Sequence, residues 1–210
     1  MKGPRKYDIT DVMLRVEFKF IVAAFLLLFA FSTYTKNPNF THELCLLAMF
    51  FSFLGDLLLM DYQNIPSYTF NGKHFYVGAA MFCVAHIIYS RMFRALIVDK
   101  MFWGVGEWIA LIILAISCIF AFFAKLRKRS KLFYGVAIIY ACIILMNLAS
   151  AINCALVLGG KYIWALAGVI CFVISDLFLL IRETKSDTPL IRKLIWVFYP
   201  VAQILIIFNV

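Results

Sequence analysis

The chain has 210 residues, of which 65% are hydrophobic and only 15% are charged, and 22 of them are phenylalanine. Soluble domains are typically about 45–50% apolar and about 25% charged, and a chain of this size could not hide so much apolar surface in one core. The composition therefore excludes a cytosolic enzyme, a disordered chain and a secreted disulfide scaffold. It predicts an all-α, polytopic integral membrane protein in which residues 1–210 form a single transmembrane helical domain.

The formal net charge of +9 would suggest a nucleic acid partner in a soluble protein. In a membrane protein the same excess arises because Lys and Arg accumulate in cytoplasmic loops, so no nucleic acid partner is expected. The six cysteines form no CxxC pair and lie in apolar runs, so we expect small buried side chains and no disulfide framework. The three histidines have no HxxxH spacing, and neither a metal site nor a cofactor is expected.

Seven apolar segments each approach the length of about 20 residues that a helix needs to cross the hydrocarbon core. They run over residues 16–34, 42–60, 75–94, 103–124, 131–151, 161–182 and 190–209. The fifth segment stays apolar as far as Leu158, which leaves an eighth transmembrane helix open. With seven spans, most of the 20 Lys and Arg fall in the N-terminal segment and in loops on the same side. The positive-inside rule then predicts a cytoplasmic N-terminus.

Two acidic residues, Asp56 and Asp176, lie inside predicted spans. The other acids, Glu107 among them, lie in predicted loops or near helix ends, where we expect solvated or interfacial charges. An Asp at the bilayer centre costs roughly 2.5–3.5 kcal/mol on insertion scales. At about 1.5 Å per residue, Asp56 and Asp176 both lie roughly 6–9 Å from the inner ends of their helices. We interpret them as functional, the alternative being a structural pair of buried acids.

The third predicted span carries a polar and aromatic face. Its residues Gly78, Phe82, His86, Tyr89 and Phe93 fall within about 80° of one another on a helix. A single histidine on such a face is often a satisfied core residue. With two Asp at comparable depth, we favour a functional role for His86.

The fifth and last predicted spans also carry polar groups. Tyr199 and Gln203 are one helical turn apart and share a face, and Pro200 between them frees a backbone carbonyl. The fifth span contributes Tyr140 and Asn147. Polar side chains within a span can form hydrogen bonds between helices, so helix packing explains their presence as well as a functional site does.

Four ordered motifs resemble a known family. They are Gly55-Asp56-x-x-Leu59-Met60; Gly78, Phe82, His86, Tyr89 and Phe93 at helical spacing; Gly168, Phe172, Ser175 and Asp176; and Tyr199, Ala202, Gln203, Leu205 and Ile206. Tyr140 and Met146 fit the family's fifth-span pattern. Together the motifs resemble the YhhN-like family of membrane proteins, which includes the lysoplasmalogenases.

The resemblance implies hydrolysis of the vinyl ether bond of lysoplasmenylcholine or lysoplasmenylethanolamine, giving a fatty aldehyde and a glycerophospho-base. The expected partners are this lysophospholipid and the lipid bilayer, and the expected location is the inner (cytoplasmic) membrane of a bacterium. The sequence indicates no oligomeric state. The expected catalytic pair is Asp56 and Asp176. The expected substrate-binding residues are His86, Tyr89, Tyr199, Gln203, Tyr140, Phe82 and Ser175.

The residue chemistry agrees with that reaction. A vinyl ether is hydrolysed by proton transfer to carbon, which leaves an oxocarbenium ion that water captures. Such a site needs a proton donor and a nearby anion, and two carboxyl groups in one pocket of low dielectric supply both.

Two other functions remain open. Residues 55–60 resemble residues 175–180, and both segments lie in spans that run inward. Spans one to three and five to seven could then form a parallel repeat joined by the fourth span, as in some small transporters. A proton-coupled or small-molecule transporter of this kind is the main alternative to an enzyme. The second alternative is a lipid-binding or scaffolding membrane protein.

Overall fold

The structure is a computed structural model, and it describes residues 9–59, 74–97, 104–123, 131–185 and 188–210. All regular structure in these ranges is helical. The helices are α1 (Ile9–Lys36), α2 (Phe40–Leu59), α3 (His74–Leu96), α4 (Val105–Phe123), α5 (Lys131–Leu158), α6 (Lys161–Thr184) and α7 (Pro189–Asn209). All of them except α4 are long and apolar enough to cross a membrane, and α4 contributes a shorter apolar stretch, Val105–Leu114. The prediction of a polytopic helical membrane bundle is confirmed.

The fifth predicted segment is one continuous helix, α5, rather than two membrane crossings. It extends to Leu158, beyond the predicted end at residue 151. Gly159 and Gly160 follow with φ angles of +61° and +53°. Glycine adopts this left-handed conformation without steric penalty, so the pair ends α5 and turns the chain into α6. Within the described residues the chain therefore has seven helices and no eighth crossing.

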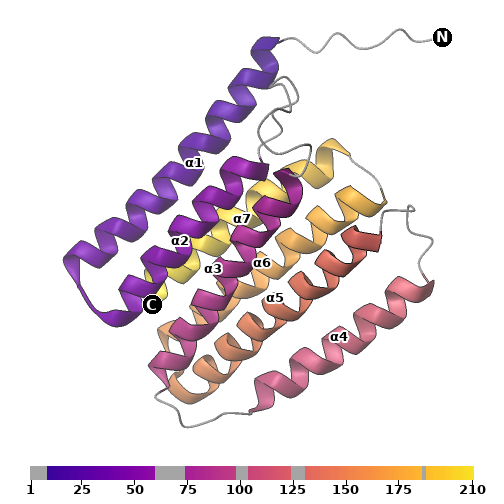
Figure 1. Cartoon of the computed structure of the whole chain (residues 1–210). Coiled ribbons are helices and arrows are strands. Elements are labelled where there is room, and N and C mark those ends of the chain that lie inside the picture. Colours follow the sequence, from indigo (N-terminus) through magenta and orange to yellow (C-terminus); the bar gives the residue numbers. More distant parts are fainter. Residues whose placement is uncertain (1–8, 60–73, 98–103, 124–130, 186–187) are drawn as a thin grey trace, which may run out of the picture.

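The helices alternate in direction, so α1, α3, α5 and α7 all begin at one end of the bundle (Figure 1). We call this the first end and the opposite one the second end. The predicted orientation assigns the first end to the cytoplasm. Many of the charges behind that prediction lie in residues 1–8 and 124–130, outside the described residues. Lys73 and Met60 of the first motif also lie outside them.

The most extensive helix contacts are those between α6 and α7 and between α2 and α3. Both pairs approach closely at glycine. A Cβ atom on Gly168 of α6 would lie 2.8 Å from the Ala202 carbonyl oxygen of α7. A Cβ atom on Gly55 of α2 would lie 2.6 Å from the Phe82 ring of α3. Small residues allow this approach in a membrane bundle.

The two edge helices are α1, which packs on α2 and to a smaller extent on α7, and α4, which packs on α5 (Figure 1). The other helices form the centre of the bundle. Five described cysteines are free. Cys45 and Cys154 are buried as expected, whereas Cys142 is exposed. The expectation of buried cysteines is therefore wrong for Cys142.

Candidate active site

Asp56 is buried in the last turn of α2, with 7% of its surface exposed. The Tyr199 hydroxyl, from the middle of α7, donates a hydrogen bond of 2.6 Å to Asp56 Oδ2. Tyr199 is itself buried. The carboxyl group therefore lies in the protein interior with a neutral hydroxyl as its hydrogen-bond donor.

Asp176 is held in a similar way in α6. The Tyr140 hydroxyl of α5 donates a hydrogen bond of 2.7 Å to Asp176 Oδ2. His86 Nε2 of α3 lies 3.6 Å from the same oxygen and 3.4 Å from the Tyr140 oxygen. The His86 side chain is fully buried, whereas that of Asp176 is 14% exposed. Three helices thus meet at this carboxyl group.

A group of aromatic rings packed edge to face joins the two carboxyl groups. The Phe172 ring of α6 packs edge-on against Tyr199, with centroids 5.4 Å apart, and against His86, at 4.5 Å. Phe82 of α3 contacts both Phe172 and Tyr199. The two acids therefore share one aromatic-lined region of the bundle. We call the two acids, their partners and these rings the acid-pair cluster: Asp56, Asp176, Tyr199, Tyr140, His86, Phe82 and Phe172.

Further polar side chains support this cluster from the core. The Tyr89 hydroxyl donates a hydrogen bond of 2.7 Å to Gln203 Oε1, one turn along α7 from Tyr199. Asn147 Nδ2 lies 3.1 Å from His86 Nδ1 on the side of the ring away from Asp176. Both contacts are buried. They fix the ring of His86 and the side chain of Gln203.

Ser175 has a different role in the structure from the other predicted site residues. Its hydroxyl donates a hydrogen bond of 3.3 Å to the Ile195 carbonyl oxygen and so links α6 to α7. Asp56, Asp176, His86, Tyr140, Tyr199 and Phe82 all lie in the acid-pair cluster, and Tyr89 and Gln203 lie directly behind it.

Sequence reasoning gave no site role to Phe172, although it is one turn from Asp176 on α6 and its ring touches both halves of the cluster. It also overlooked Lys19 and Trp196 near the first end. Lys19 Nζ lies 5.1 Å from the centre of the Trp196 ring. The helical spacing from Asp176 could have revealed Phe172. The sequence offers no reason to assign Lys19 a site role, because the positive-inside rule already explains a lysine at that position.

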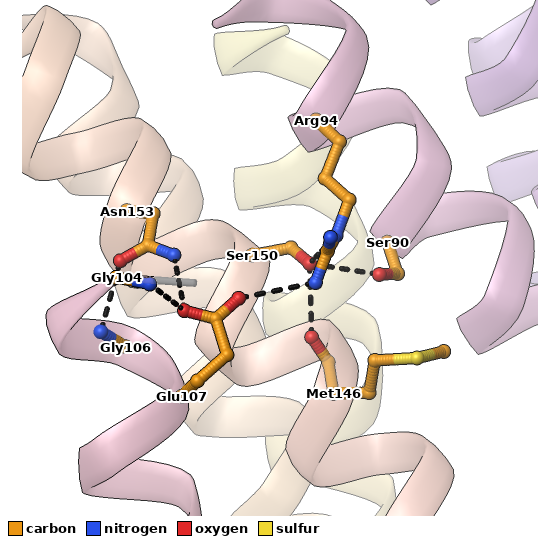
Figure 2. Close-up of polar contacts among 8 residues, drawn as sticks. All are labelled: Ser90, Arg94, Gly104, Gly106, Glu107, Met146, Ser150 and Asn153. Carbon is orange, nitrogen blue, oxygen red and sulfur yellow. Dashed lines mark hydrogen bonds and ion pairs between the residues drawn. The ribbon is translucent and has the colours of Figure 1, made fainter. Parts of the chain in front are cut away.

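A second polar cluster lies toward the second end, where α3, α4 and α5 meet (Figure 2). Arg94 Nη2 donates to Glu107 Oε1 at 3.0 Å. Glu107 Oε2 accepts from the Gly104 backbone N–H and from Asn153 Nδ2, both at 2.7 Å. Glu107 is only 8% exposed. The expectation of a solvated charge is therefore wrong for Glu107, because a cation and two further donors satisfy it in the interior.

The rest of this second cluster is also paired. Arg94 Nε donates to Ser150 Oγ at 3.1 Å, and Ser150 contacts Ser90 at 2.8 Å. A cavity of about 340 Å³ between α4 and α5 borders the ion pair. No residue of the acid-pair cluster lines it. We call these side chains the Arg94–Glu107 cluster.

Among the described residues, no group of three or more His, Cys, Asp or Glu side chains is arranged to hold a metal ion. The acid-pair cluster itself offers two carboxylates and one imidazole, whose Nε2 is directed at Asp176. The arrangement is suited to holding and moving protons beside an apolar ligand.

Comparison with known proteins gives one match. The model of the YhhN family matches residues 14–210, which is nearly the whole chain. No match was found among curated proteins or among solved structures.

Proposed function

Because the chain belongs to the YhhN family, we propose that it is a membrane-embedded hydrolase of the lysoplasmalogenase type, in a bacterial inner membrane. Its substrates are lysoplasmenylcholine and lysoplasmenylethanolamine. Its products are a fatty aldehyde and the corresponding glycerophospho-base. The observation that carries the proposal is the pair of acids, Asp56 and Asp176, each bonded to a Tyr hydroxyl around shared aromatic rings.

The reaction adds one water molecule across the vinyl ether and then breaks a C–O bond. One carboxyl group donates its proton to the vinyl carbon remote from oxygen, and an oxocarbenium ion forms. The other, as a carboxylate, stabilises this cation and accepts a proton from the attacking water. The resulting hemiacetal releases the glycerol oxygen as an alcohol and leaves the aldehyde. Glycosidases meet the same cation with the same pair of groups.

The surroundings of the two acids suit this division of roles. Among the described residues, no Lys or Arg forms an ion pair with either carboxyl group. Two nearby carboxyls with no Lys or Arg bonded to them are expected to share a proton, so that one is a donor and the other an anion. Their titrations are coupled, and the acid and base roles belong to the pair.

Tyr199 and Tyr140 orient the two carboxyl groups in this proposal. Phe82 and Phe172 line the path of the hydrocarbon chain and exclude bulk water. His86 holds Asp176 from the α3 side. Tyr89 and Gln203 fix the position of α7, and with it Tyr199.

The test is a turnover assay with the purified protein in detergent. Lysoplasmenylethanolamine, lysoplasmenylcholine and an ester-linked lysophospholipid of equal chain length are supplied separately, and fatty aldehyde is measured. We expect aldehyde from the vinyl ether and no hydrolysis of the ester. Folded protein that forms no aldehyde from either head-group class between pH 5 and 8 would refute the proposal.

The transporter alternative gains support from one observation. The helix pairs with the most extensive contacts, α2–α3 and α6–α7, occupy equivalent places in the two proposed halves, and each carries one acid. A carrier predicts uptake of substrate into protein-containing liposomes without chemical change. Liposomes that convert the lipid to aldehyde without accumulating it would decide for the hydrolase.

A further inference from the structure

The first end of the bundle places a cation beside the path to Asp56. Lys19 lies one residue into the described apolar part of α1, which begins at Phe18. Its ammonium group lies 5.1 Å from the centre of the Trp196 ring of α7. Lys19 is partly buried, and its charge acts on the Asp56 carboxyl group.

Contacts continue without a break from this cation to the acid. The Trp196 ring packs edge-on against Tyr199, with centroids 6.1 Å apart. The Tyr199 hydroxyl then bonds to Asp56. One line of side chains therefore runs from a positive charge near the predicted interface, past two rings, to a carboxyl group in the interior.

The proposed substrate has the same order of groups. Its phosphate is separated from the vinyl ether only by the glycerol carbons, and its hydrocarbon chain continues beyond. A phosphate at Lys19 would place the glycerol beside Trp196 and direct the vinyl ether toward Asp56. Lys binds phosphate as a compact charge with three donors, and Trp suits the boundary between head group and chain.

Other cations at the first end are placed less favourably. Both Arg182 Nε and Arg182 Nη2 donate to Glu183 Oε1, so that charge is already balanced. Lys185 and Lys193 are exposed. Arg182 and Lys185 lie at the end of α6 and Lys193 lies inside α7, near its start, whereas Lys19 belongs to α1.

We propose that Lys19 and Trp196 form the head-group subsite of this protein, in which the Lys19 ammonium binds the phosphate of a single-chain glycerophospholipid. The inference rests on the proposed function, and it adds the part of the substrate that the acid pair does not recognise. It makes α1 a substrate-binding helix although it is at the edge of the bundle.

The test compares lipids with and without phosphate. Binding of ester-linked lysophosphatidylethanolamine and of a monoacylglycerol with the same chain is measured in detergent for the wild type, Lys19→Gln, Lys19→Arg and Lys185→Gln. Neither lipid needs to be cleaved. Lys19→Gln is expected to weaken binding of the phospholipid about tenfold to a hundredfold, the range for a bond to a charged group. Binding of the monoacylglycerol stays as in the wild type.

The two other variants make the result specific. Lys19→Arg keeps the charge and is expected to bind both lipids within about threefold of the wild type. Lys185→Gln removes an exposed cation at the same end and is expected to change neither affinity. A Lys19→Gln variant that loses both lipids equally, or neither, would overturn the proposal, because a lysine that only anchors α1 has no preference for phosphate.

The turnover assay separates this proposal from the proposed function. With lysoplasmenylethanolamine, Lys19→Gln is expected to raise KM by a similar factor and to leave kcat nearly unchanged. Phosphate-selective binding without any aldehyde would refute the hydrolase and retain the head-group subsite. Aldehyde formation by the wild type, together with equal loss of both lipids in Lys19→Gln, would support the hydrolase and refute the head-group subsite.

Discussion

The two polar clusters of the bundle show what distinguishes a buried polar group that holds helices together from one available for chemistry. The Arg94–Glu107 cluster contains one cation and one anion, and both Glu107 oxygens accept hydrogen bonds. The acid-pair cluster contains two carboxyl groups whose hydrogen-bond donors are Tyr hydroxyls. Burial of polar side chains is common to both, whereas a carboxylate bonded directly to an arginine is found only in the first.

The difference has an energetic meaning. A buried ion pair with further hydrogen bonds offsets much of its desolvation cost, and removal of one partner is strongly unfavourable. Two acids whose hydrogen-bond donors are Tyr hydroxyls offset less of that cost, and ionisable groups inside a membrane are functional by default. We therefore propose that the Arg94–Glu107 cluster stabilises the fold and that the acid-pair cluster carries the reaction.

The largest expected effect is on turnover. Asp56→Asn and Asp176→Asn each keep a hydrogen-bond acceptor for the Tyr hydroxyl but remove the titratable group. Each is expected to lower the rate of aldehyde formation by at least about a hundredfold, the typical contribution of general acid–base catalysis. Glu183→Gln, on the same helix as Asp176, is the matched control. Turnover near that of the wild type in either Asp variant would contradict the catalytic assignment.

The second effect is on stability. Glu107→Ala leaves Arg94 without its anion and is expected to destabilise the protein by about 2–3 kcal/mol, allowing for the partial exposure of Arg94. The measurement is the thermal unfolding midpoint in detergent. The double variant Arg94→Met/Glu107→Leu is expected to unfold at a higher temperature than Glu107→Ala, because an apolar pair leaves no unpaired charge. Loss of turnover in folded Glu107→Ala protein would contradict the claim that the Arg94–Glu107 cluster contributes only to stability.

A smaller effect is expected at the two tyrosines. Tyr199→Phe and Tyr140→Phe remove the hydroxyl that orients each acid and keep the ring packing. We expect each to reduce kcat about tenfold, which corresponds to the loss of one hydrogen bond to a charged group. The control is Tyr162→Phe, near the start of α6 and away from both acids. Equal effects of all three substitutions would argue against an orienting role.

The smallest effect is expected at Ser175. Its hydroxyl bonds to the Ile195 carbonyl oxygen and not to a residue of the acid-pair cluster. Ser175→Ala is expected to cost about 0.5–1.5 kcal/mol of stability, as for one ordinary hydrogen bond. Its kcat is expected to stay within about threefold of the wild type. A loss of kcat as large as that of the Asp variants would show that the Ser175 hydroxyl takes part in the reaction.

The sequence predicted the helices and the positions of the two acids well. Apolar segments mark membrane spans, and an Asp within such a segment is conspicuous at any position. The polar face of α3 was also predictable, because helical spacing alone places Phe82, His86 and Tyr89 together. The motifs also identified the family.

Pairings between distant helices could not be predicted in the same way. Tyr199 reaches Asp56, and Tyr140 reaches Asp176, only because α7 packs near α2 and α5 packs beside α6, and neither contact leaves a local pattern. The prediction for Glu107 was wrong for a related reason. A charge near a helix end usually reaches water, but here α3 and α5 cover it and supply its donors.

The most direct test of the proton-transfer mechanism is hydrolysis in D₂O. If a carboxyl group of the acid pair protonates the vinyl carbon, the aldehyde carries a single deuterium on the carbon next to its carbonyl group. Lysoplasmenylethanolamine is incubated with the protein in D₂O, the aldehyde is trapped as it forms, and its mass is measured. The account predicts one deuterium in the wild-type product and no product above background with Asp56→Asn or Asp176→Asn. Deuterated aldehyde formed at close to the wild-type rate by either Asp variant would contradict the central claim, because the proton would then come from a donor other than the acid pair.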